Sequence, residues 1–528
     1  MEAEKKNSPA PEAKPPLTDF QIITGVTENQ AGDAAIYIAV NRGKFIYVER
    51  WGCWLKWIGH RWQRDLGERK TIAAVSRVVD EYCGLAARIR KLLKEGSIPD
   101  EGKPPLNVES YERLLKELSR KIHHLRGCAG RKNVVEYART CPDRSLVIDG
   151  EELDVDPWLL TCANGVIELR TGELRPGRPE DFLTCASPTE WRGLDEPCPN
   201  FEKFLLEILG DNRDVVDYIQ RMLGHALIGE QREHVFLVLS GAQGQNGKGT
   251  LMKVLDYVLG PDLMVPVPAE MLLDQGFTKS SSGPSPDIMS LRGRRLAYAE
   301  ETDEGRRFSS SKVKQLSGGG RLVARGTYDL EMSYWEQTHT LILLTNDLPH
   351  ARADDQAFWY RLHVVRFLYS FVSSPNPKNA FERQKDSDLD KKLRAEAPGI
   401  LAWLVRGCLE YQRKGLASPP AVTEATRDYR AAEDLVGRFL SECCEIKDEA
   451  EIQASVLYDN FHWWYSREVS RKRDFSNIRF SESLKKKGFA KNRKAAGNYW
   501  RNIVLTDDFQ RERREAELDG EPRKGGLC

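Results

Sequence analysis

The stretch from His234 to Gly260, "HVFLVLSGAQGQNGKGTLMKVLDYVLG", decides the fold of this chain. It begins with a continuous apolar run at 235–240, which is typical of a strand buried on both faces of a parallel sheet. A loop rich in Gly, Gln and Asn follows, and the segment from Lys248 onward has helical periodicity and ends in glycine. Strand, glycine loop and helix in this order predict a phosphate-binding loop in an α/β domain.

Backbone N–H groups of such a loop, with the positive end of the following helix, hold phosphate oxygens, and Lys248 is expected to reach the β- and γ-phosphates. The strict pattern Gly-x4-Gly-Lys-Ser/Thr is not met, because Gly241 stands one residue too early and Gly249 takes the hydroxyl position, with Thr250 one later. An ordinary glycine-rich turn before a helix is the alternative interpretation. The predicted nucleotide-binding residues are Gly241, Gly244, Gln245, Asn246, Gly247, Lys248, Gly249 and Thr250.

Polar side chains follow the next apolar runs along the chain. "LAYA" ends in Glu300 and Glu301, acids of the kind that hold magnesium or polarise water. "THTLILLTNDLP" is a second buried strand that ends at Asn346, whose amide can position an attacking water, although Asn-Asp-x-Pro also favours a simple turn. Arg361 follows the aromatic pair in "DDQAFWYRLHVVRF", and an arginine can stabilise charge on a transferring phosphate, often from an adjacent subunit.

The order of these features is more informative than any one of them. Taken alone, the acids fit a solvated turn and the arginine fits an exposed surface. Together, three apolar runs each end in a group suited to phosphate chemistry, and an arginine follows. This arrangement indicates a ring-forming ATPase.

Composition sets wider limits. A chain of 528 residues predicts several domains, and Lys+Arg and Asp+Glu number 79 each, so net charge gives no evidence for a nucleic-acid partner. No apolar run is long enough to cross a bilayer, and the opening "MEAEKKNSPAPEAKPP" predicts a disordered tail instead of a signal peptide. Eleven cysteines without a Cys-x-x-Cys pair indicate reduced thiols in a cytosolic protein.

The region before the phosphate loop combines helices with two small β regions. The three- and four-residue apolar spacing in "ERKTIAAVSRVVDEYCGLAARIRKLL" predicts a helix, and "KFIYVERWGCWLKWIGHRWQRD" predicts a small sheet. "DPWLLTCANGVIELRTGELRPG" predicts a hairpin with turns at Asn164-Gly165 and Thr171-Gly172. From Phe201 to Ile228 the pattern is helical again.

The last hundred residues are basic and aromatic. One amphipathic helix carries Leu457 and Phe461, a second lies around Phe480, and a hairpin is expected to turn at Ala496-Gly497-Asn498. Two helices and a basic wing predict a winged helix, which places its second helix in a duplex groove. A charged solvated face on a protein–protein module is the alternative. The predicted core residues here are Trp463, Trp464 and Trp500, and the predicted DNA contacts are Arg473, Lys485, Lys486, Lys487, Lys491 and Arg493.

A family resemblance joins these features. "GQNGKGT", "RLAYAEETDEGRRF", "KQLSGGGRLVARGTYDLEM", "HTLILLTNDLP" and "FWYRLHVVRF" together resemble the superfamily 3 helicases. More narrowly, the chain is similar to the phage and plasmid primase-helicase family, which has poxvirus relatives, over nearly everything between residues 18 and 505. The resemblance implies an AAA+ type ATPase core that works as a homo-hexamer on single-stranded and forked DNA, with ATP and Mg²⁺ as cofactors.

The resemblance also implies roles for single residues. Glu301 matches the catalytic acid, Asn346 the sensor and Arg361 the arginine finger of the family, and Lys248 matches the phosphate-binding lysine. Glu300 and Thr250 are the expected metal-binding residues. The segment from Lys314 to Arg325 matches a hairpin-bearing motif that meets DNA, and its basic members are Lys314, Arg321 and Arg325. The family often has Asp where this chain has Gly320, so the hairpin departs from the family pattern there.

The expected fold class is α/β, with a mainly helical domain before the ATPase core and a winged helix after it. No Asp-x-Asp pair stands at the end of a strand, so the sequence predicts a helicase without its own primase, served by a separate primase or polymerase. The predicted divisions are a disordered tail at 1–17, a helicase-associated domain at 18–195, a superfamily 3 AAA+ core at 196–400, a helical linker at 401–435, a winged helix at 436–510 and a second disordered tail at 511–528.

The predicted function is an ATP-driven DNA helicase of a phage, plasmid or mobile element, working as a hexameric ring in the cytoplasm of a bacterial host and not on a membrane. A nucleotide-dependent DNA-binding initiator or scaffold that recruits a host helicase is the main alternative, favoured by Gly249. A protein-remodelling ATPase is a third hypothesis, and the basic C-terminal region argues against it.

Overall fold

The computed structural model describes residues 17–95, 108–140, 144–241, 244–276, 283–300, 305–327, 331–468 and 475–518. The chain divides into two compact units. The first comprises Met1–Glu168 and Glu173–Trp191, and the second comprises Leu169–Gly172 and Arg192–Cys528. Among the helices in these described ranges, none has the length and apolar character needed to span a bilayer.

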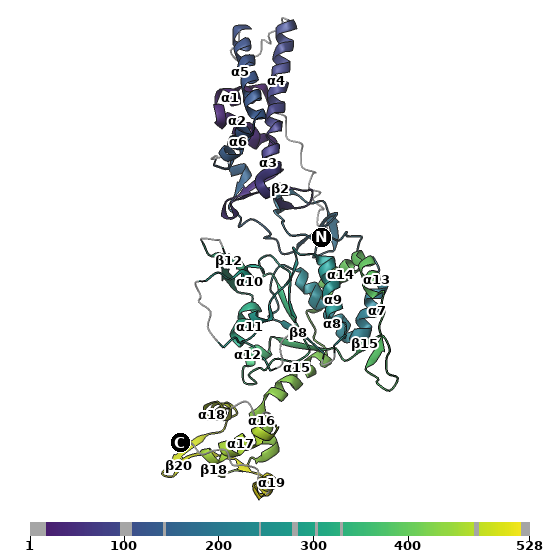
Figure 1. The fold of residues 1–528 in the computed structure, drawn as a ribbon, viewed down its shortest axis with the longest axis vertical. Helices are drawn as coiled ribbons and strands as arrows, with labels where there is room; N and C mark the ends of the chain where they lie inside the picture. The colour runs from purple at the N-terminus through teal and green to yellow at the C-terminus, as the bar shows by residue number, and fades with distance from the viewer. Residues whose placement is uncertain are drawn as a thin grey trace, which may run out of the picture. The chain divides into compact units, whose positions relative to one another are not determined.

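The first unit begins with a group of helices in which α4 and α5 run side by side (Figure 1). Apolar residues at helical spacing on α4, such as Val78, Tyr82 and Leu85, are buried, which confirms the predicted helix. A buried ion pair between Lys121 and Asp33, 2.8 Å apart, joins α5 to α2. The helices are α1 (Asp19–Thr27), α2 (Asn29–Asn41), α3 (Arg69–Ala73), α4 (Ser76–Glu95), α5 (Val108–Arg126) and α6 (Cys128–Thr140).

The rest of this unit consists of two small sheets. One has the order β3-β2-β1-β4 and the other is the meander β5-β6-β7, so the predicted sheet and the predicted hairpin are both present. The described part of 144–191 contains strands and short 3-10 turns and no α-helix, so the domain predicted at 18–195 as mainly helical has its α-helices in the described residues up to Thr140. The strands are β1 (Phe45–Val48), β2 (Cys53–Trp57), β3 (Trp62–Arg64), β4 (Val147–Ile148), β5 (Leu159–Cys162), β6 (Gly165–Glu168) and β7 (Glu173–Arg175).

The second unit is built on a five-stranded parallel sheet with the order β14-β8-β13-β10-β9. Its strands are continuous apolar runs because both faces of the sheet are covered. The apolar run that opens the predicted phosphate loop is β8, whose neighbours are β13 and β14. The strands are β8 (Phe236–Ser240), β9 (Met264–Pro266), β10 (Leu296–Glu300), β13 (Thr340–Thr345) and β14 (Leu362–Arg366).

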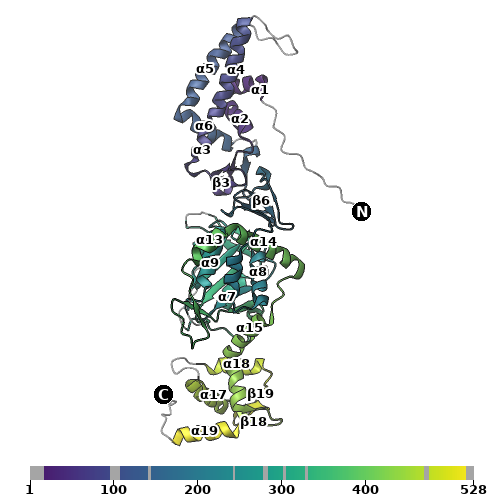
Figure 2. The same cartoon turned by 90° about the vertical axis from the view of Figure 1, so that its right-hand side faces the viewer.

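Helices α8, α9 and α14 lie together in this unit (Figure 2), where α8 and α14 cross at two glycines. A Cβ on Gly224 would lie 2.1 Å from the backbone N of Cys408, and a Cβ on Gly407 would lie 2.1 Å from the backbone O of Gln220. Larger side chains would therefore force the two helices apart. The helices are α7 (Pro199–Ile208), α8 (Arg213–Leu227), α9 (Lys248–Leu259), α13 (Leu389–Ala395) and α14 (Ala397–Lys414).

A hydrophobic cluster joins the sheet to the segments around α11, α12 and α15. Phe236 and Val364 of the sheet share it with Phe358 of α12 and Tyr429 of α15. Because α15 packs on β14 and α14 packs on α8, the prediction of a linker at 401–435 is wrong: the segment is helical, but both helices bury their apolar faces in the sheet domain. The elements here are α10 (Pro286–Met289), α11 (Ser310–Leu316), β11 (Arg321–Ala324), β12 (Ser333–Glu336), α12 (Gln356–Trp359), β15 (Ser370–Val372), β16 (Glu382–Gln384) and α15 (Pro420–Glu433).

The described C-terminal part has four helices and a three-stranded antiparallel sheet of order β18-β20-β19. Trp464 and Trp500 are buried in its core as predicted, and Trp463 is partly buried against Phe509. The prediction of disorder at 511–528 is wrong for its described part, because α19 continues to Leu518 and is anchored by Phe509. The elements are α16 (Leu435–Cys443), β17 (Cys444–Glu445), β18 (Glu451–Gln453), α17 (Ala454–Glu468), α18 (Asn477–Lys486), β19 (Lys491–Lys494), β20 (Gly497–Arg501), β21 (Val504–Leu505) and α19 (Asp507–Leu518).

Candidate nucleotide-binding site

The glycine loop joins β8 to α9 at the carboxyl edge of the sheet. Gly247 precedes the first residue of α9 with φ 86°, a left-handed conformation that favours glycine. A Cβ on Gly247 would also lie 2.5 Å from Cγ2 of Ile208, the last residue of α7. Gly247 is thus required both by its backbone conformation and by the close approach of α7. Residues 242–243 of the loop lie outside the described ranges.

Strand β15 holds the loop from the other side, a contact that sequence analysis missed. The Phe371 backbone N–H donates to the backbone O of Gln245 at 2.9 Å. The Ser370 hydroxyl donates to the backbone O of Gly244 at 3.1 Å. These bonds occupy loop carbonyls, not N–H groups, so they leave loop donors available for an anion.

Lys248 is the buried cation of the site. Only 6% of its surface is exposed, and its ammonium donates to Oδ1 of Asn346 at 2.9 Å and to the backbone O of Gly241 at 3.3 Å. Both acceptors are neutral, and Lys248 forms no ion pair with any carboxylate in the described ranges. Burial lowers its pKa to about 8. An ammonium held this way is costly in isolation, and a polyanion beside it would remove that cost.

The predicted sensor and acid come to the same edge as the loop. Asn346 directly follows β13, which pairs with β8, and Glu300 ends β10, which pairs with β13. Adjacent strands lie about 4.8 Å apart, so the ends of β8, β13 and β10 form one row. The structure thereby brings Lys248 and Asn346 into contact and places Glu300, whose side chain is exposed, two strands from β8.

Glu301, the predicted catalytic acid, lies outside the described residues. The described residues contain no group of three or more His, Cys, Asp or Glu side chains that could hold a metal ion. The predicted metal-binding roles of Thr250 and Glu300 therefore stay predictions, and any ion at this edge would take its remaining ligands from phosphate oxygens and water, as Mg²⁺ does in many phosphate sites.

Arg361 lies at the opposite edge of the sheet. Its backbone O accepts a hydrogen bond of 2.6 Å from the N–H of Phe236, the first residue of β8, and the next residue begins β14. Five strand residues separate it from the carboxyl edge, a distance of about 16 Å. The structure therefore keeps Arg361 away from the loop of its own chain.

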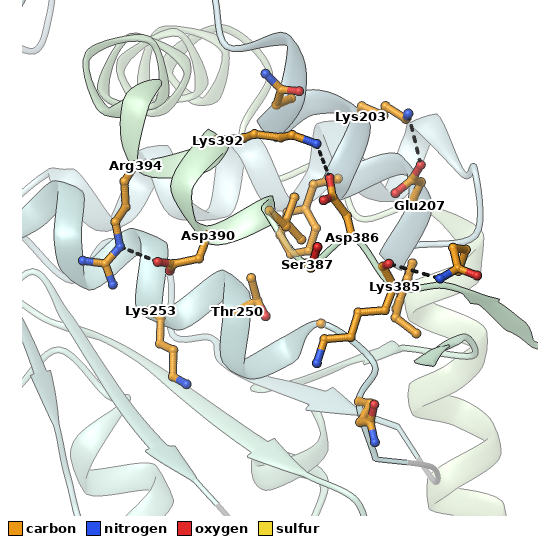
Figure 3. Close-up of a pocket in the computed structure, with 17 residues that line it drawn as sticks. Lys203, Glu207, Thr250, Lys253, Lys385, Asp386, Ser387, Asp390, Lys392 and Arg394 are labelled. Carbon is orange, nitrogen blue, oxygen red and sulfur yellow. Dashed lines mark hydrogen bonds and ion pairs between the residues drawn. The ribbon is translucent and has the colours of Figure 1, made fainter. Parts of the chain in front are cut away.

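A pocket of about 1060 Å³ adjoins the loop on the side of α7 and α13. Figure 3 shows Thr250 and Lys253 of α9 among the lining residues, with Asp386, Ser387 and Asp390 above them in the view. Three of its cations are paired with carboxylates: Lys392 with Asp386 at 2.6 Å, Arg394 with Asp390 at 2.8 Å and Lys203 with Glu207 at 3.8 Å. Lys253 and Lys385 form no ion pair within the described ranges, so positive charge is left over beside the loop. No sequence motif predicted that residues 384–394 line a pocket, because this segment resembles an ordinary charged surface.

The predicted DNA-binding residues differ in their exposure and in the contacts that they make within the chain. Arg321 is exposed on β11 and pairs with Glu336 of β12 at 2.8 Å, whereas Lys314 of α11 pairs with Asp355 at 3.0 Å. The backbone O of Arg325 accepts from the N–H of Ser285 at 2.9 Å.

In the C-terminal part, the predicted basic wing is the hairpin β19–β20, in which Lys494 pairs with Gly497 in the register. Lys491 lies over the ring of Trp500, and Arg493 is exposed. Lys485 is exposed in the last turn of α18. Lys486 pairs with Asp354 and Lys487 with Asp434. Arg473 lies outside the described residues.

Comparison with known proteins shows what the chain is similar to. The family model described as "D5 N terminal like" matches residues 34–210. The chain is 29% identical over 455 residues to a "Putative helicase" of Acanthamoeba polyphaga mimivirus, covering 82% of this chain and 46% of that protein. It is 24% identical over 396 residues to a "Putative primase" of African swine fever virus, covering 71% of this chain and 40% of that protein.

These matches support a relationship to a primase-helicase family. Another relative of this family, a "Putative helicase" of Frog virus 3, is 24% identical over 435 residues, covering 68% of this chain and 44% of that protein. The chain thus spans less than half the length of these three relatives. All three are viral proteins, so the predicted phage or plasmid origin and bacterial cytoplasm stay predictions.

Two solved structures of the NrS-1 C-terminal region match the chain with low TM-scores. One has a TM-score of 0.32 and 13% identity, covering 59% of this chain and 76% of that chain. The other, of residues 305–718, has a TM-score of 0.33 and 12% identity, covering 67% of this chain and all of that chain.

Proposed function

We propose that this chain is the helicase part of a replication primase-helicase, an ATP-hydrolysing DNA helicase of superfamily 3 with an AAA+ type core. The observation that carries the proposal is the contact between Lys248 and Asn346, 2.9 Å apart, beside a glycine loop at the carboxyl edge of a parallel sheet. Ligands of open α/β sheets bind at this edge, outside the ends of the strands. The viral relatives named as helicases and primases support the same activity.

The residues present fit Mg²⁺-ATP. Lys248 is a buried cation that lacks a carboxylate partner in the described ranges, and the N-terminus of α9 directs N–H groups toward the loop. Lys248 would hold the β- and γ-phosphates, and Asn346 would orient the attacking water. Glu301 would accept a proton from that water, and Glu300 and Thr250 would hold the metal ion. When bound, that ion would neutralise charge on the phosphates.

The pocket next to the loop suits the remaining part of the nucleotide. It begins at Gly247 and Thr250, and Phe204, Phe371 and Leu389 line it together with polar groups. Its volume of about 1060 Å³ is large enough for a nucleoside. The triphosphate would therefore run from this pocket across the loop toward Asn346.

The position of Arg361 is the observation that favours assembly into a ring. Because it lies at the opposite edge of the sheet, its guanidinium would act on a nucleotide bound by a neighbouring subunit. Such an arginine stabilises the charge of the transferring phosphate and is worth about a thousandfold or more in turnover. We therefore propose a closed homo-oligomer, with six subunits as in the family that the chain resembles.

The DNA contacts are proposed on two elements. The hairpin β11–β12, which carries Arg321, would meet DNA in the centre of the ring. The C-terminal helices with the three-stranded sheet β18-β20-β19 fit a winged helix, whose hairpin carries Lys491 and Arg493. Phosphate contacts of this kind give salt-sensitive binding without sequence preference.

Strand displacement on a forked DNA tests the proposal. Wild-type protein with ATP and Mg²⁺ is expected to separate the strands, and Lys248→Ala is expected to remove both hydrolysis and unwinding. Lys414→Ala is the matched control, because this exposed lysine on α14 pairs with Glu410 of the same helix at 3.0 Å. ATP-dependent DNA binding without displacement would instead support an initiator or scaffold that recruits a helicase. Hydrolysis that DNA does not change would support a protein-remodelling ATPase.

A further inference from the structure

Two adjacent acids, Asp354 and Asp355, stand directly before α12 and each receives a lysine from a predicted DNA-binding element. Asp355 pairs with Lys314 of α11 at 3.0 Å, and Asp354 pairs with Lys486 of α18. Both acids are mostly buried, with 23% and 18% of their side chains exposed. These are ion pairs between segments far apart in the sequence.

Asp355 also fixes the start of α12. Its carboxylate accepts a hydrogen bond from the Phe358 N–H at 3.2 Å, which makes it the N-cap of this four-residue helix. Arg361 follows at the other end. Its N–H donates to the backbone O of Phe358 at 3.0 Å, and its guanidinium donates to the backbone O of Ala357 at 2.7 Å. The direction of Arg361 therefore depends on α12, and α12 is held at its start by Asp355.

Lys314 connects the same acid to the hairpin. Helix α11 carries it and leads through Gly318-Gly319-Gly320 into β11, and α11 lies next to α12 (Figure 1). The Gln337 side chain, just after β12, donates to the backbone O of Gln315 at 2.7 Å. Both ends of the hairpin are thus attached to α11, so a shift of the hairpin moves the ammonium that pairs with Asp355.

Asp354 makes the second connection. Arg352 pairs with it at 3.1 Å, in addition to Lys486. Burial alone would raise the pKa of Asp354, but the hydrogen bonds from Arg352 and Lys486 outweigh it and lower the pKa to about 2. The acid stays ionised at neutral pH, and a DNA phosphate that drew Lys486 away would leave it paired with Arg352 alone.

We propose that Asp355, with Asp354 beside it, is a positioning residue that passes DNA contact on to Arg361. This proposal rests on the proposed helicase function, in which Arg361 acts on the nucleotide of a neighbouring subunit. DNA on the hairpin shifts α11, the Lys314–Asp355 pair transmits the shift to α12, and Arg361 moves toward the transferring phosphate. Neither acid touches the nucleotide or the DNA.

The test measures ATP turnover with and without single-stranded DNA. Asp355→Ser keeps a capping hydroxyl for α12 but is too short to reach Lys314. We expect it to lower the stimulation of kcat by DNA about tenfold to a hundredfold, the range for a catalytic group displaced by about an ångström. The KM for ATP should stay within about twofold, because the finger acts on the transition state. Asp355→Ala removes both the cap and the ion pair. The difference between Asp355→Ala and Asp355→Ser therefore measures the effect of the cap.

Lys314→Met breaks the same ion pair from the other side and keeps the test valid if an Asp355 variant does not fold. The proposal predicts that Lys314→Met and Asp355→Ser share one defect and that the double variant is no worse than either. Unchanged DNA stimulation in Asp355→Ser, or defects that multiply in the double variant, would overturn it. Wild-type protein that does not hydrolyse ATP would instead overturn the proposed function.

Discussion

The buried ammonium of Lys248 makes ATP binding depend on pH. Burial lowers its pKa to about 8, so the nucleotide-free protein loses this proton at mildly alkaline pH. A bound triphosphate favours the charged form and raises the pKa again. ATP binding above pH 8 must therefore take up a proton, and the affinity must fall as the pH rises.

The size of the effect follows from the pKa. Affinity should be almost flat below pH 7.5 and should weaken about 25-fold between pH 7.5 and 9.5, as neutral lysine becomes the main form. Proton uptake should approach about one per ATP at pH 9.5. The same shift predicts that stability rises with pH between about 8 and 10.5, because the folded chain releases this proton before the unfolded chain does. That gain is about 3 kcal/mol.

Isothermal titration calorimetry in buffers with different ionisation enthalpies measures both the affinity and the proton uptake. Lys248→Arg is the control, because a guanidinium stays charged throughout this range. Its ATP affinity should not change between pH 7.5 and 9.5, whatever its absolute value. A flat profile in the wild type, or an equal slope in Lys248→Arg, would refute the assignment of Lys248 to the phosphates.

Three glycine substitutions test the geometry. Gly247→Ala should destabilise the fold by about 2–4 kcal/mol in urea unfolding and abolish ATP binding, since φ is 86° and Ile208 lies 2.5 Å from the added carbon. Gly224→Val should lower stability by at least about 3 kcal/mol, because α8 and α14 would be forced apart; an unchanged urea midpoint would contradict this. Gly249→Ser should keep the wild-type melting temperature and hydrolyse ATP at least as fast as the wild type, because the space around Gly249 is open. Slower hydrolysis by this variant would show that position 249 does not accommodate the Ser/Thr hydroxyl of the phosphate-loop pattern.

Local patterns were sufficient to predict the centre of the fold. The apolar run before the loop, the glycines and the periodic helix after Lys248 are consecutive in sequence, so β8 and α9 could be recognised without tertiary information. The contact between Lys248 and Asn346 followed from parallel strands that end at one edge. The burial of Trp464 and Trp500 followed from their spacing among other apolar residues.

Tertiary packing decided what the sequence did not show. Strands β15 and β16 have three residues each, too short for a periodic pattern, yet they bring the segment with Lys385 beside the loop. The amphipathic face of α14 did not reveal that it packs on α8, so the helix was predicted to be a linker. Lys314 was predicted to contact DNA because its partner Asp355 is distant in sequence. In the highly charged helix α19, Phe509 is the one buried residue among the described positions 507–518, and it anchors the helix.

Release of inorganic phosphate from ATP, measured side by side for wild type and Lys248→Ala with and without single-stranded DNA, tests the central claim most directly. The wild type should release phosphate, faster with DNA, and Lys248→Ala should release none above background while remaining folded. A wild type inert toward ATP, or a Lys248→Ala variant that turns over ATP at the wild-type rate, would contradict the claim that this loop is the catalytic nucleotide site.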